Sequence, residues 1–318
     1  MGLKKLILNI AVISLALCLF IIWHQTFIDT SVQTKNSDFK LKYYDVYLIT
    51  TDKEYQYWSI MNQGATDMAV LTGVNYVWDA PAERNVNKQI EVIKKAVDAG
   101  ADVLLVAADD PKLISRVIED AKARGIEVIY VDSPANEEAI TTLATDNYEA
   151  GVRAGQVMIS VLNSMEINSG SIGIISYAAK ANTELRERGF RETLAKDDRF
   201  NILETIYTVS GDPEEAQEAA QRMMNENEDL VALFGTNEGT SVGVGNAIKA
   251  NDNKYVGVGF DKTDAMMKLL QEGSLKAVIG QNPYTMGYLG VAEAVAALLG
   301  KDTGPEYINT GVSVYSNY

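Results

Sequence analysis

The chain is constrained most by a regular alternation of short apolar runs and amphipathic segments, which begins after residue 42. β-Prone apolar runs occur at 46–49, 74–78, 103–106 and 128–131. Between the second and third runs, Val86, Ile90, Ile93 and Val97 recur at helical spacing. The run at 103–106 is apolar throughout, which is typical of a strand in a sheet covered on both faces. The pattern predicts an α/β fold with parallel sheets.

The same alternation restarts near residue 148. We expect strands at 172–175, 202–209, 231–234, 256–260 and 277–280, and helices over about 148–162, 184–195 and 286–299. These units are more than one sheet comfortably holds. The two cycles therefore indicate two similar lobes with a cleft between them.

Composition excludes several classes of protein. The 318 residues carry a net charge of −15, so the basic surplus of a nucleic-acid-binding protein is missing. One cysteine, Cys18, and one histidine, His24, rule out an internal disulfide, a thiolate cluster, a histidine triad and a multi-histidine metal site. The glycine-rich stretch 239–245 lacks the lysine of a nucleotide-binding loop. We expect no enzyme activity, no cofactor and no metal.

Residues 1–42 differ from the rest, with a net charge of +3 against −18 for the remainder. The run 6–23 is apolar apart from Asn9 and Ser14, and its roughly 27 Å as a helix would span a bilayer. Lys4 and Lys5 place the N-terminus in the cytoplasm. We expect 1–23 to be a cytoplasmic N-terminus and transmembrane anchor, 24–42 a linker, and the body an extracytoplasmic part of a single-pass cell-membrane protein. A cleaved signal peptide and a lipoprotein signal at Cys18 are the alternatives.

Polar and aromatic side chains follow several of the expected strands. In parallel α/β sheets, ligands bind beyond the carboxyl ends of the strands. Carboxylates, amides and arginines can hydrogen-bond vicinal hydroxyls, and flat aromatic rings can cover the apolar face of a sugar. The residues placed in this way are Tyr55, Tyr57, Trp58, Asp132, Asn237, Glu238, Asp261 and Gln281, with Arg186 and Arg188 opening the helix after 172–175.

Each candidate also has an ordinary structural interpretation. Asp132 and Asp261 could be N-caps of the next helices. The two arginines could lie on a solvated helix face, and Tyr57 and Trp58 could be core residues. Their joint placement at the strand ends favours a binding site.

The ordered motifs across about 43–318 resemble the type I periplasmic binding proteins for sugars, nearest to the ribose- and xylose-binding type. The motifs are Asn62-Gln63-Gly64-Ala65, Ala99-Gly100-Ala101-Asp102, Val131-Asp132, Thr145-Asp146-Asn147, Arg186-Glu187-Arg188-Gly189-Phe190, Phe234 through Asn237-Glu238, Val258-Gly259-Phe260-Asp261 and Gly280-Gln281.

The resemblance implies a site in which Tyr57 and Trp58 clamp a sugar ring. Asp132, Arg188, Asn237, Asp261 and Gln281 would hydrogen-bond its hydroxyls, with Tyr55, Ser133, Arg186 and Glu238 as secondary candidates. The sequence departs from the ribose pattern, which has asparagine at Ala107, arginine at Ser133 and phenylalanine near Ser210. These departures argue against ribose itself.

The resemblance further implies two Rossmann-like lobes, 43–146 plus 282–310 and 147–281 plus 311–318, joined by a three-segment hinge. The protein would be a receptor for a pentose, with D-xylose as first choice. Closure on the sugar would signal to a membrane histidine kinase, as in the anchored xylose-sensing members. Alternatives are the substrate-binding subunit of an ABC sugar importer, working with a permease, and a receptor for an autoinducer or another polyol. A lactose-type repressor shares the fold, but the N-terminus offers no helix-turn-helix.

Overall fold

The structure is a computed structural model that describes residues 43–177 and 181–317. The predicted anchor at 1–23 and linker at 24–42, with Cys18 and His24, lie outside these residues. From Tyr44 onward the chain forms one compact unit. Within the described residues, no helix combines the length and apolar character needed to cross a membrane.

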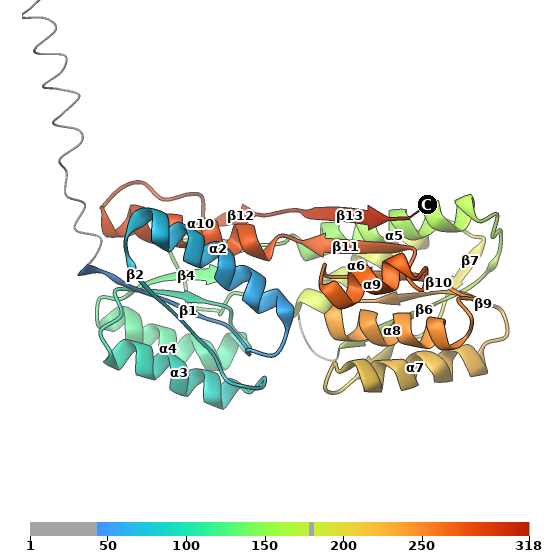
Figure 1. The fold of residues 1–318 in the computed structure, drawn as a ribbon, viewed down its shortest axis with the longest axis horizontal. Helices are drawn as coiled ribbons and strands as arrows, with labels where there is room; N and C mark the ends of the chain where they lie inside the picture. Colours follow the sequence, from blue (N-terminus) through green and yellow to red (C-terminus); the bar gives the residue numbers. More distant parts are fainter. Residues whose placement is uncertain (1–42, 178–180, 318) are drawn as a thin grey trace, which may run out of the picture. The chain divides into compact units, whose positions relative to one another are not determined.

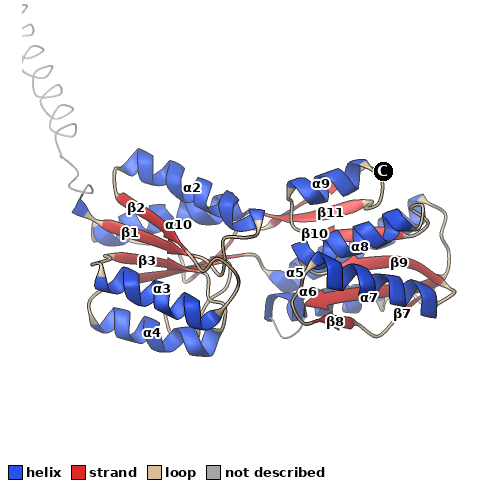
Figure 2. Ribbon diagram, turned by 60° about the horizontal axis from the view of Figure 1, so that its bottom comes forward, coloured by secondary structure: helices blue, strands red, loops and turns tan. Residues whose placement is uncertain are grey.

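The first lobe is built on a six-stranded sheet whose strand pairs are all parallel (Figure 1). Its strands, in the order β12-β5-β4-β3-β1-β2, are β1 (Asp45–Ile49), β2 (Asn75–Asp79), β3 (Val103–Val106), β4 (Glu127–Val131), β5 (Thr142–Ala144) and β12 (Tyr307–Asn309). Helices α2 (Gln56–Thr72) and α10 (Pro283–Leu298) cover one face, and α3 (Val86–Asp98) and α4 (Pro111–Ala123) cover the other (Figure 2).

The second lobe has a seven-stranded sheet in the order β13-β11-β10-β9-β6-β7, with β8 also paired to β6. Its strands are β6 (Gly170–Tyr177), β7 (Phe200–Ile202), β8 (Ile206–Thr208), β9 (Leu230–Gly235), β10 (Val256–Phe260), β11 (Ala277–Gln281) and β13 (Val312–Ser316). One apolar cluster packs α5 (Asn147–Ser164) and α6 (Ala181–Leu194) on the sheet, and a second packs α7 (Pro213–Glu226), α8 (Glu238–Ala250) and α9 (Asp264–Gln271) on its other face.

The two parallel-dominated α/β lobes confirm the fold class predicted from the sequence, with three differences in detail. The expected strand 202–209 is two strands, β7 and β8, separated by residues 203–205. β5, β12 and β13 were not predicted, because they are short or only partly buried and carry no continuous apolar run. β13 pairs with β11 in antiparallel fashion, whereas parallel sheets were predicted.

The chain passes between the lobes at three places that are hydrogen-bonded to one another. These are the connections β5 to α5, β11 to α10 and β12 to β13. Asn282 Nδ2 donates to the Thr310 carbonyl at 2.6 Å, and the Thr310 N–H donates to the Ala144 carbonyl at 2.9 Å. The three connections therefore form one short bonded hinge between the two sheets.

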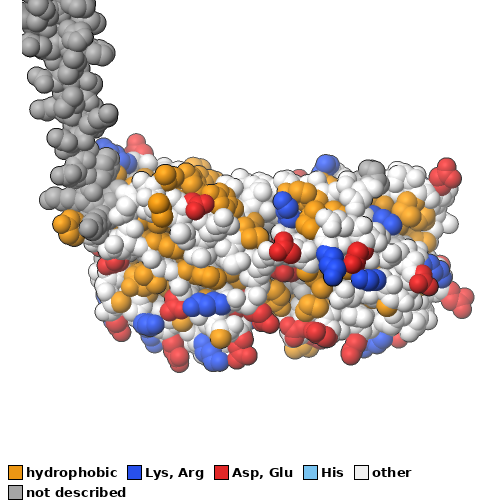
Figure 3. Space-filling model, viewed as in Figure 1, with side chains coloured by type: hydrophobic (Ala, Val, Ile, Leu, Met, Phe, Trp, Pro, Cys, Tyr) orange, Lys and Arg blue, Asp and Glu red, His pale blue; other side chains and the backbone are white. Residues whose placement is uncertain are grey.

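Charged side chains of both signs are spread over the surface. On the face seen in Figure 3, acidic and basic side chains are interspersed, and no basic patch of the kind that nucleic-acid binding needs stands out on it. Hydrophobic side chains show over α2, where Val70 and Leu71 are 76% and 71% exposed.

Candidate functional site

Asp132 and Asp261 occupy equivalent positions in the two lobes. Asp132 follows β4 and Asp261 follows β10. Their backbone N–H groups donate to the neighbouring strands, to the carbonyls of Leu143 and Ile279, at 2.8 Å each. Both residues are buried and have positive φ values, 63° and 77°, a conformation that aspartate adopts more readily than most residues. Neither is the N-cap of a helix. The element that follows Asp132 is strand β5, and the helix that follows Asp261, α9, is capped by Thr263. The helix-cap interpretation is therefore wrong for both.

Arg186 is the buried cation that faces these two carboxylates. Its Nε donates to Asn147 Oδ1 at 2.8 Å, one Nη donates to the Thr236 carbonyl at 3.0 Å, and its guanidinium lies 3.8 Å from the centre of the Phe260 ring. Burial lowers the pKa of Arg186, and the charges of Asp261 and Asp132 oppose that shift. These three contacts hold the guanidinium in place.

The same electrostatics act on the two aspartates. Burial raises the pKa of Asp132 and of Asp261, and in both cases the positive charge of Arg186 works against it. Two buried carboxylates beside one guanidinium form an acceptor-rich centre. Such a centre suits a ligand with several hydroxyl donors.

Arg188, the arginine favoured by the sequence analysis, is not part of this group. Its side chain is exposed and lies over the Tyr148 ring, 5.1 Å from the ring centre. Two residues along a helix correspond to a rotation of about 200°, so Arg186 and Arg188 cannot face the same way on α6. The structure brings Arg186, the secondary candidate, to the carboxylates instead.

Tyr57 and Trp58 lie at the first turn of α2 and turn their polar edges toward acidic side chains. The Tyr57 hydroxyl donates to Asp132 Oδ1 at 2.7 Å, and the Trp58 Nε1 donates to Asp52 Oδ2 at 3.0 Å. The two rings meet edge to face, with centres 4.9 Å apart. Burial and the neighbouring Asp132 raise the pKa of Tyr57 well above its usual value, so the phenol keeps its proton and remains a donor.

On the second lobe, Gln281 and Glu238 hold Asp261 from two directions. Gln281 Nε2 donates to Asp261 Oδ1 at 2.7 Å, and the Glu238 backbone N–H donates to Asp261 Oδ2 at 3.0 Å. Among the described residues, Gln281 Oε1 and Glu238 Oε2 are buried without a hydrogen-bond partner. They are two acceptors that a hydroxylated ligand could satisfy. Burial, reinforced by Asp261, raises the pKa of Glu238 to about 7.

Of the remaining candidates, Asn237 and Ser133 form side-chain hydrogen bonds within the protein. Asn237 caps α8, where its Oδ1 accepts a hydrogen bond from the Thr240 hydroxyl at 2.7 Å. Ser133 donates its hydroxyl to the Ala108 carbonyl at 3.1 Å. Tyr55 is the N-cap residue of α2, and burial raises the pKa of its hydroxyl. Asn237 and Ser133 therefore have protein bonds of their own, which any ligand contact would share or replace.

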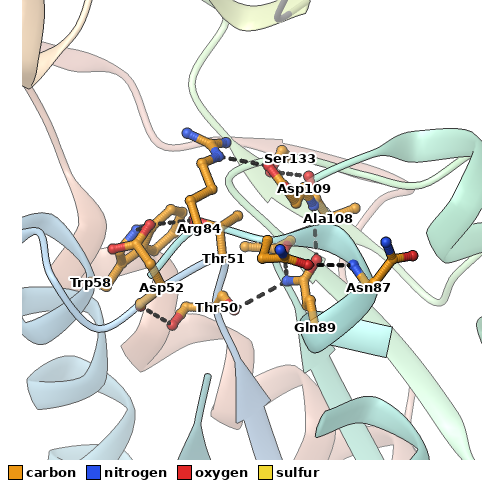
Figure 4. A network of polar contacts seen from close by, with 12 residues as sticks. Thr50, Thr51, Asp52, Trp58, Arg84, Asn87, Gln89, Ala108, Asp109 and Ser133 are labelled. Atoms are coloured by element: carbon orange, nitrogen blue, oxygen red, sulfur yellow. Dashed lines mark hydrogen bonds and ion pairs between the residues drawn. The ribbon is translucent and has the colours of Figure 1, made fainter. Parts of the chain in front are cut away.

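Asp52 and Gln89, which were not predicted from the sequence, hold the loops of the first lobe (Figure 4). Asp52 is fully buried and accepts hydrogen bonds from the Thr51 hydroxyl, the Trp58 indole and the N–H groups of Glu54 and Tyr55. Buried Gln89 donates to the carbonyls of Thr50 and Ala107, which ties the end of β1 to the end of β3. The strand-end rule selects Asp52, whereas no sequence signal distinguishes Gln89.

The described residues hold no group of three or more histidine, cysteine, aspartate or glutamate side chains arranged to bind a metal ion. What the site offers is a set of fixed donors, acceptors and ring faces contributed by both lobes.

Comparison with known proteins shows the family to which the chain belongs. Residues 46–302 match the periplasmic binding protein domain family, and the chain belongs to that family. The chain is 26% identical over 215 residues to the ribose import binding protein RbsB of Haemophilus influenzae. The matched region covers 67% of this chain and 72% of that protein. It is 23% identical over 279 residues to the xylose/arabinose-binding protein XylF of Sulfolobus acidocaldarius, covering 79% and 68%.

Solved structures share the two-lobed fold. A solute-binding protein of Burkholderia graminis, in complex with D-arabinose, superposes with a TM-score of 0.81 at 25% identity, covering 87% of this chain and 96% of that one. A periplasmic component of a sugar transport system from Hahella chejuensis gives 0.79 at 27% identity, covering 86% and 100%. These findings confirm the type I periplasmic binding protein fold.

Proposed function

We propose that the protein is an extracytoplasmic receptor for a neutral pentose, with D-xylose as the first ligand to test. The observation that carries the proposal is that two buried carboxylates, Asp132 of one lobe and Asp261 of the other, both act electrostatically on the buried Arg186. A neutral sugar fits better than an anionic one, because the buried carboxylates outnumber the buried guanidinium. The relatives are named as ribose-, allose- or xylose/arabinose-binding proteins, which supports the class of ligand.

The working motion is closure of the two lobes on the sugar, and no chemical step is involved. Closure is driven by the difference in affinity between the open and closed states. We further propose that 1–23 anchors the body to the cell membrane and that the closed form signals to a membrane histidine kinase. The predicted anchor is the reason for this choice, since it would hold the receptor beside one partner.

The alternative is a substrate-binding subunit of an ABC importer that delivers its sugar to a permease. The similarity to relatives such as the ribose import binding protein favours it. Retention of 1–42 in the mature protein, tested by N-terminal sequencing or intact mass, distinguishes the two: a retained segment favours the sensor, and a cleaved one favours the importer. A receptor for an autoinducer-type polyol is the third candidate.

A thermal-shift panel tests the ligand class. The full chain in detergent is melted with D-xylose, D-ribose, L-arabinose, D-glucose, D-galactose and an autoinducer-type polyol. A sugar present at 100 times its Kd should stabilise the protein by about 2.7 kcal/mol, which is a clear rise in Tm. Asp132→Asn should lose most of that rise, whereas Asp98→Asn, at an exposed helix end, should keep it.

The outcome decides between the candidates. A rise with one pentose, abolished by Asp132→Asn, supports the proposal and names the sugar. A rise with the polyol alone moves the assignment to the third candidate, and no rise with any compound overturns the sugar receptor.

A further inference from the structure

A second arginine, Arg84, stands at the same edge of the first lobe and has no role in the site described so far. It lies in the segment between β2 and α3. Its Nε donates to Asp109 Oδ1 at 2.6 Å, and the two side chains are 31% and 8% exposed. An exposed pair such as Arg124 with Asp98, at 59% and 70% exposure, contributes little to stability. The Arg84 pair is shorter and partly desolvated, so it holds the guanidinium in one position.

The position of Asp109 is itself fixed by the buried polar network. The Asp109 N–H donates to Gln89 Oε1 at 3.0 Å, and Gln89 Nε2 is bonded to the ends of β1 and β3 (Figure 4). Arg84 is therefore held through Asp109 by three elements of the first lobe. A side chain that served only solubility would need none of this support.

The rest of the guanidinium is free to donate. Within the described part of the chain, neither Nη of Arg84 has a hydrogen-bond partner. In Figure 4 both Nη atoms point away from Asp109 and from the other labelled side chains. Two half-buried nitrogens carry up to four N–H donors in a fixed planar arrangement, which matches a pair of adjacent oxygen atoms.

The guanidinium of Arg84 also lies close to the second lobe. The guanidinium of Arg84 lies 5.5 Å from the centre of the Tyr177 ring, and Tyr177 ends strand β6 of the second lobe. On the first-lobe side, the charge of Arg84 acts on Asp132 and lowers its pKa against the effect of burial. Arg84 is thus beside the site carboxylate, with an aromatic ring of the opposite lobe across from it.

We propose that Arg84 is a ligand-binding residue, positioned by Asp109, whose Nη groups donate to two adjacent oxygen atoms of the sugar on the first-lobe side of the site. The inference rests on the proposed sugar-binding function. The ribose pattern has an arginine where this chain has Ser133, and the Ser133 hydroxyl donates to the Ala108 carbonyl. Arg84 would supply an arginine on the first-lobe side of the site in its place. Hydrogen bonds from the Arg84 guanidinium discriminate between sugars by the arrangement of two neighbouring hydroxyls.

Calorimetric titration of the full chain tests the proposal with sugar analogues. Wild type, Arg84→Gln, Arg84→Lys and the surface control Arg124→Gln are titrated with D-xylose, D-ribose and L-arabinose. Each protein is then titrated with the single-deoxy analogues of whichever pentose binds wild type. Arg84→Gln should weaken the parent sugar about ten- to hundred-fold, because hydrogen bonds to a charged donor are lost. Arg84→Lys should fall between, and Arg124→Gln should match wild type.

The deoxy analogues separate a ligand contact from a purely structural role. Two of the analogues lack a hydroxyl that Arg84 contacts, and wild type should bind these two at least tenfold more weakly than the parent sugar. Arg84→Gln should bind the parent sugar and these two analogues nearly equally. If Arg84→Gln weakens parent and all analogues by one common factor, or has no effect, the proposal is overturned while the sugar-receptor function stands. If wild type binds none of the pentoses, both are overturned.

Discussion

At the scale of single residues, the carboxyl of Glu238 should make stability depend on pH in an unusual direction. Its pKa is raised to about 7 by burial and by Asp261. The folded state therefore binds more protons than the unfolded chain between about pH 4.5 and 7, and stability falls as pH rises through that window. Glu238→Gln removes the effect. We expect the variant to exceed wild type by about 1–3 kcal/mol at pH 8 and to match it near pH 4.5.

Thermal melts at the two pH values check this expectation. Glu306→Gln, which alters an exposed carboxyl, serves as the matched control and should show no such change with pH. A difference between Glu238→Gln and wild type that stays constant from pH 4.5 to pH 8 would contradict the assignment.

The sequence predicted single residues where their position along the chain decides their role. Asp132 and Asp261 follow strands, and the end of a strand fixes its place at the sheet edge whatever surrounds it. The choice between Arg186 and Arg188 depends on the rotational phase of α6, which is set by packing against α5 and cannot be read from the residues themselves. Arg84 follows a strand and could have been selected by the same rule, but Asp109 and Gln89, which hold it, become visible only in three dimensions.

At the scale of elements, the contact between α5 and α6 sets the position of Arg186. A Cβ placed on Gly151 of α5 would lie 2.0 Å from the Arg186 carbonyl oxygen, and one on Gly189 of α6 would lie 2.2 Å from that of Tyr148. The helices can approach this closely only because both positions are glycine. Gly151→Ala must push α6 away and carry Arg186 with it.

We expect Gly151→Ala to lower the free energy of unfolding by about 2 kcal/mol or more, as overpacking of a close contact does. Sugar affinity should drop more than tenfold in the same variant. Gln156→Ala, at an exposed position on the same helix, should stay within about 0.5 kcal/mol of wild type. Chemical denaturation measures the free energy of unfolding, and calorimetry measures the sugar affinity. An unchanged free energy of unfolding for Gly151→Ala would contradict the prediction, because it would mean that the helices separate at no cost.

Elements were predicted well where their sequence pattern is clear and the element is buried. Helices α3 and α4 carry clear helical periodicity, and strand β3 is a continuous, fully buried apolar run. The strands β5, β12 and β13 have three to five residues each and rely on neighbours for their hydrogen bonds. They are defined by pairing with β4, β5 and β11, which is a property of tertiary structure and leaves no local signal.

At the scale of the whole molecule, a reciprocal pair of hydrogen bonds joins the two lobes outside the sugar site. Gln56 of α2 donates through Nε2 to Asp264 Oδ2 at 3.1 Å, and its Oε1 accepts from the Asp264 N–H at 2.8 Å. These bonds form only when the lobes are together. They should favour the closed state without favouring any particular ligand.

Gln56→Ala should therefore weaken every sugar by the same factor, about two- to tenfold, because the apparent affinity falls with the population of the binding-competent state. Asp67→Ala is the matched control, since it breaks a similar exposed hydrogen bond, to the Tyr284 hydroxyl at 2.8 Å, between two helices of one lobe. That control should leave affinity unchanged. Titration of both variants with the pentose panel separates closure from recognition. If the affinity for every sugar falls by the same factor, Gln56 acts in closure. If the ratios of affinity between sugars change, Gln56 contacts the ligand and the closing role is contradicted.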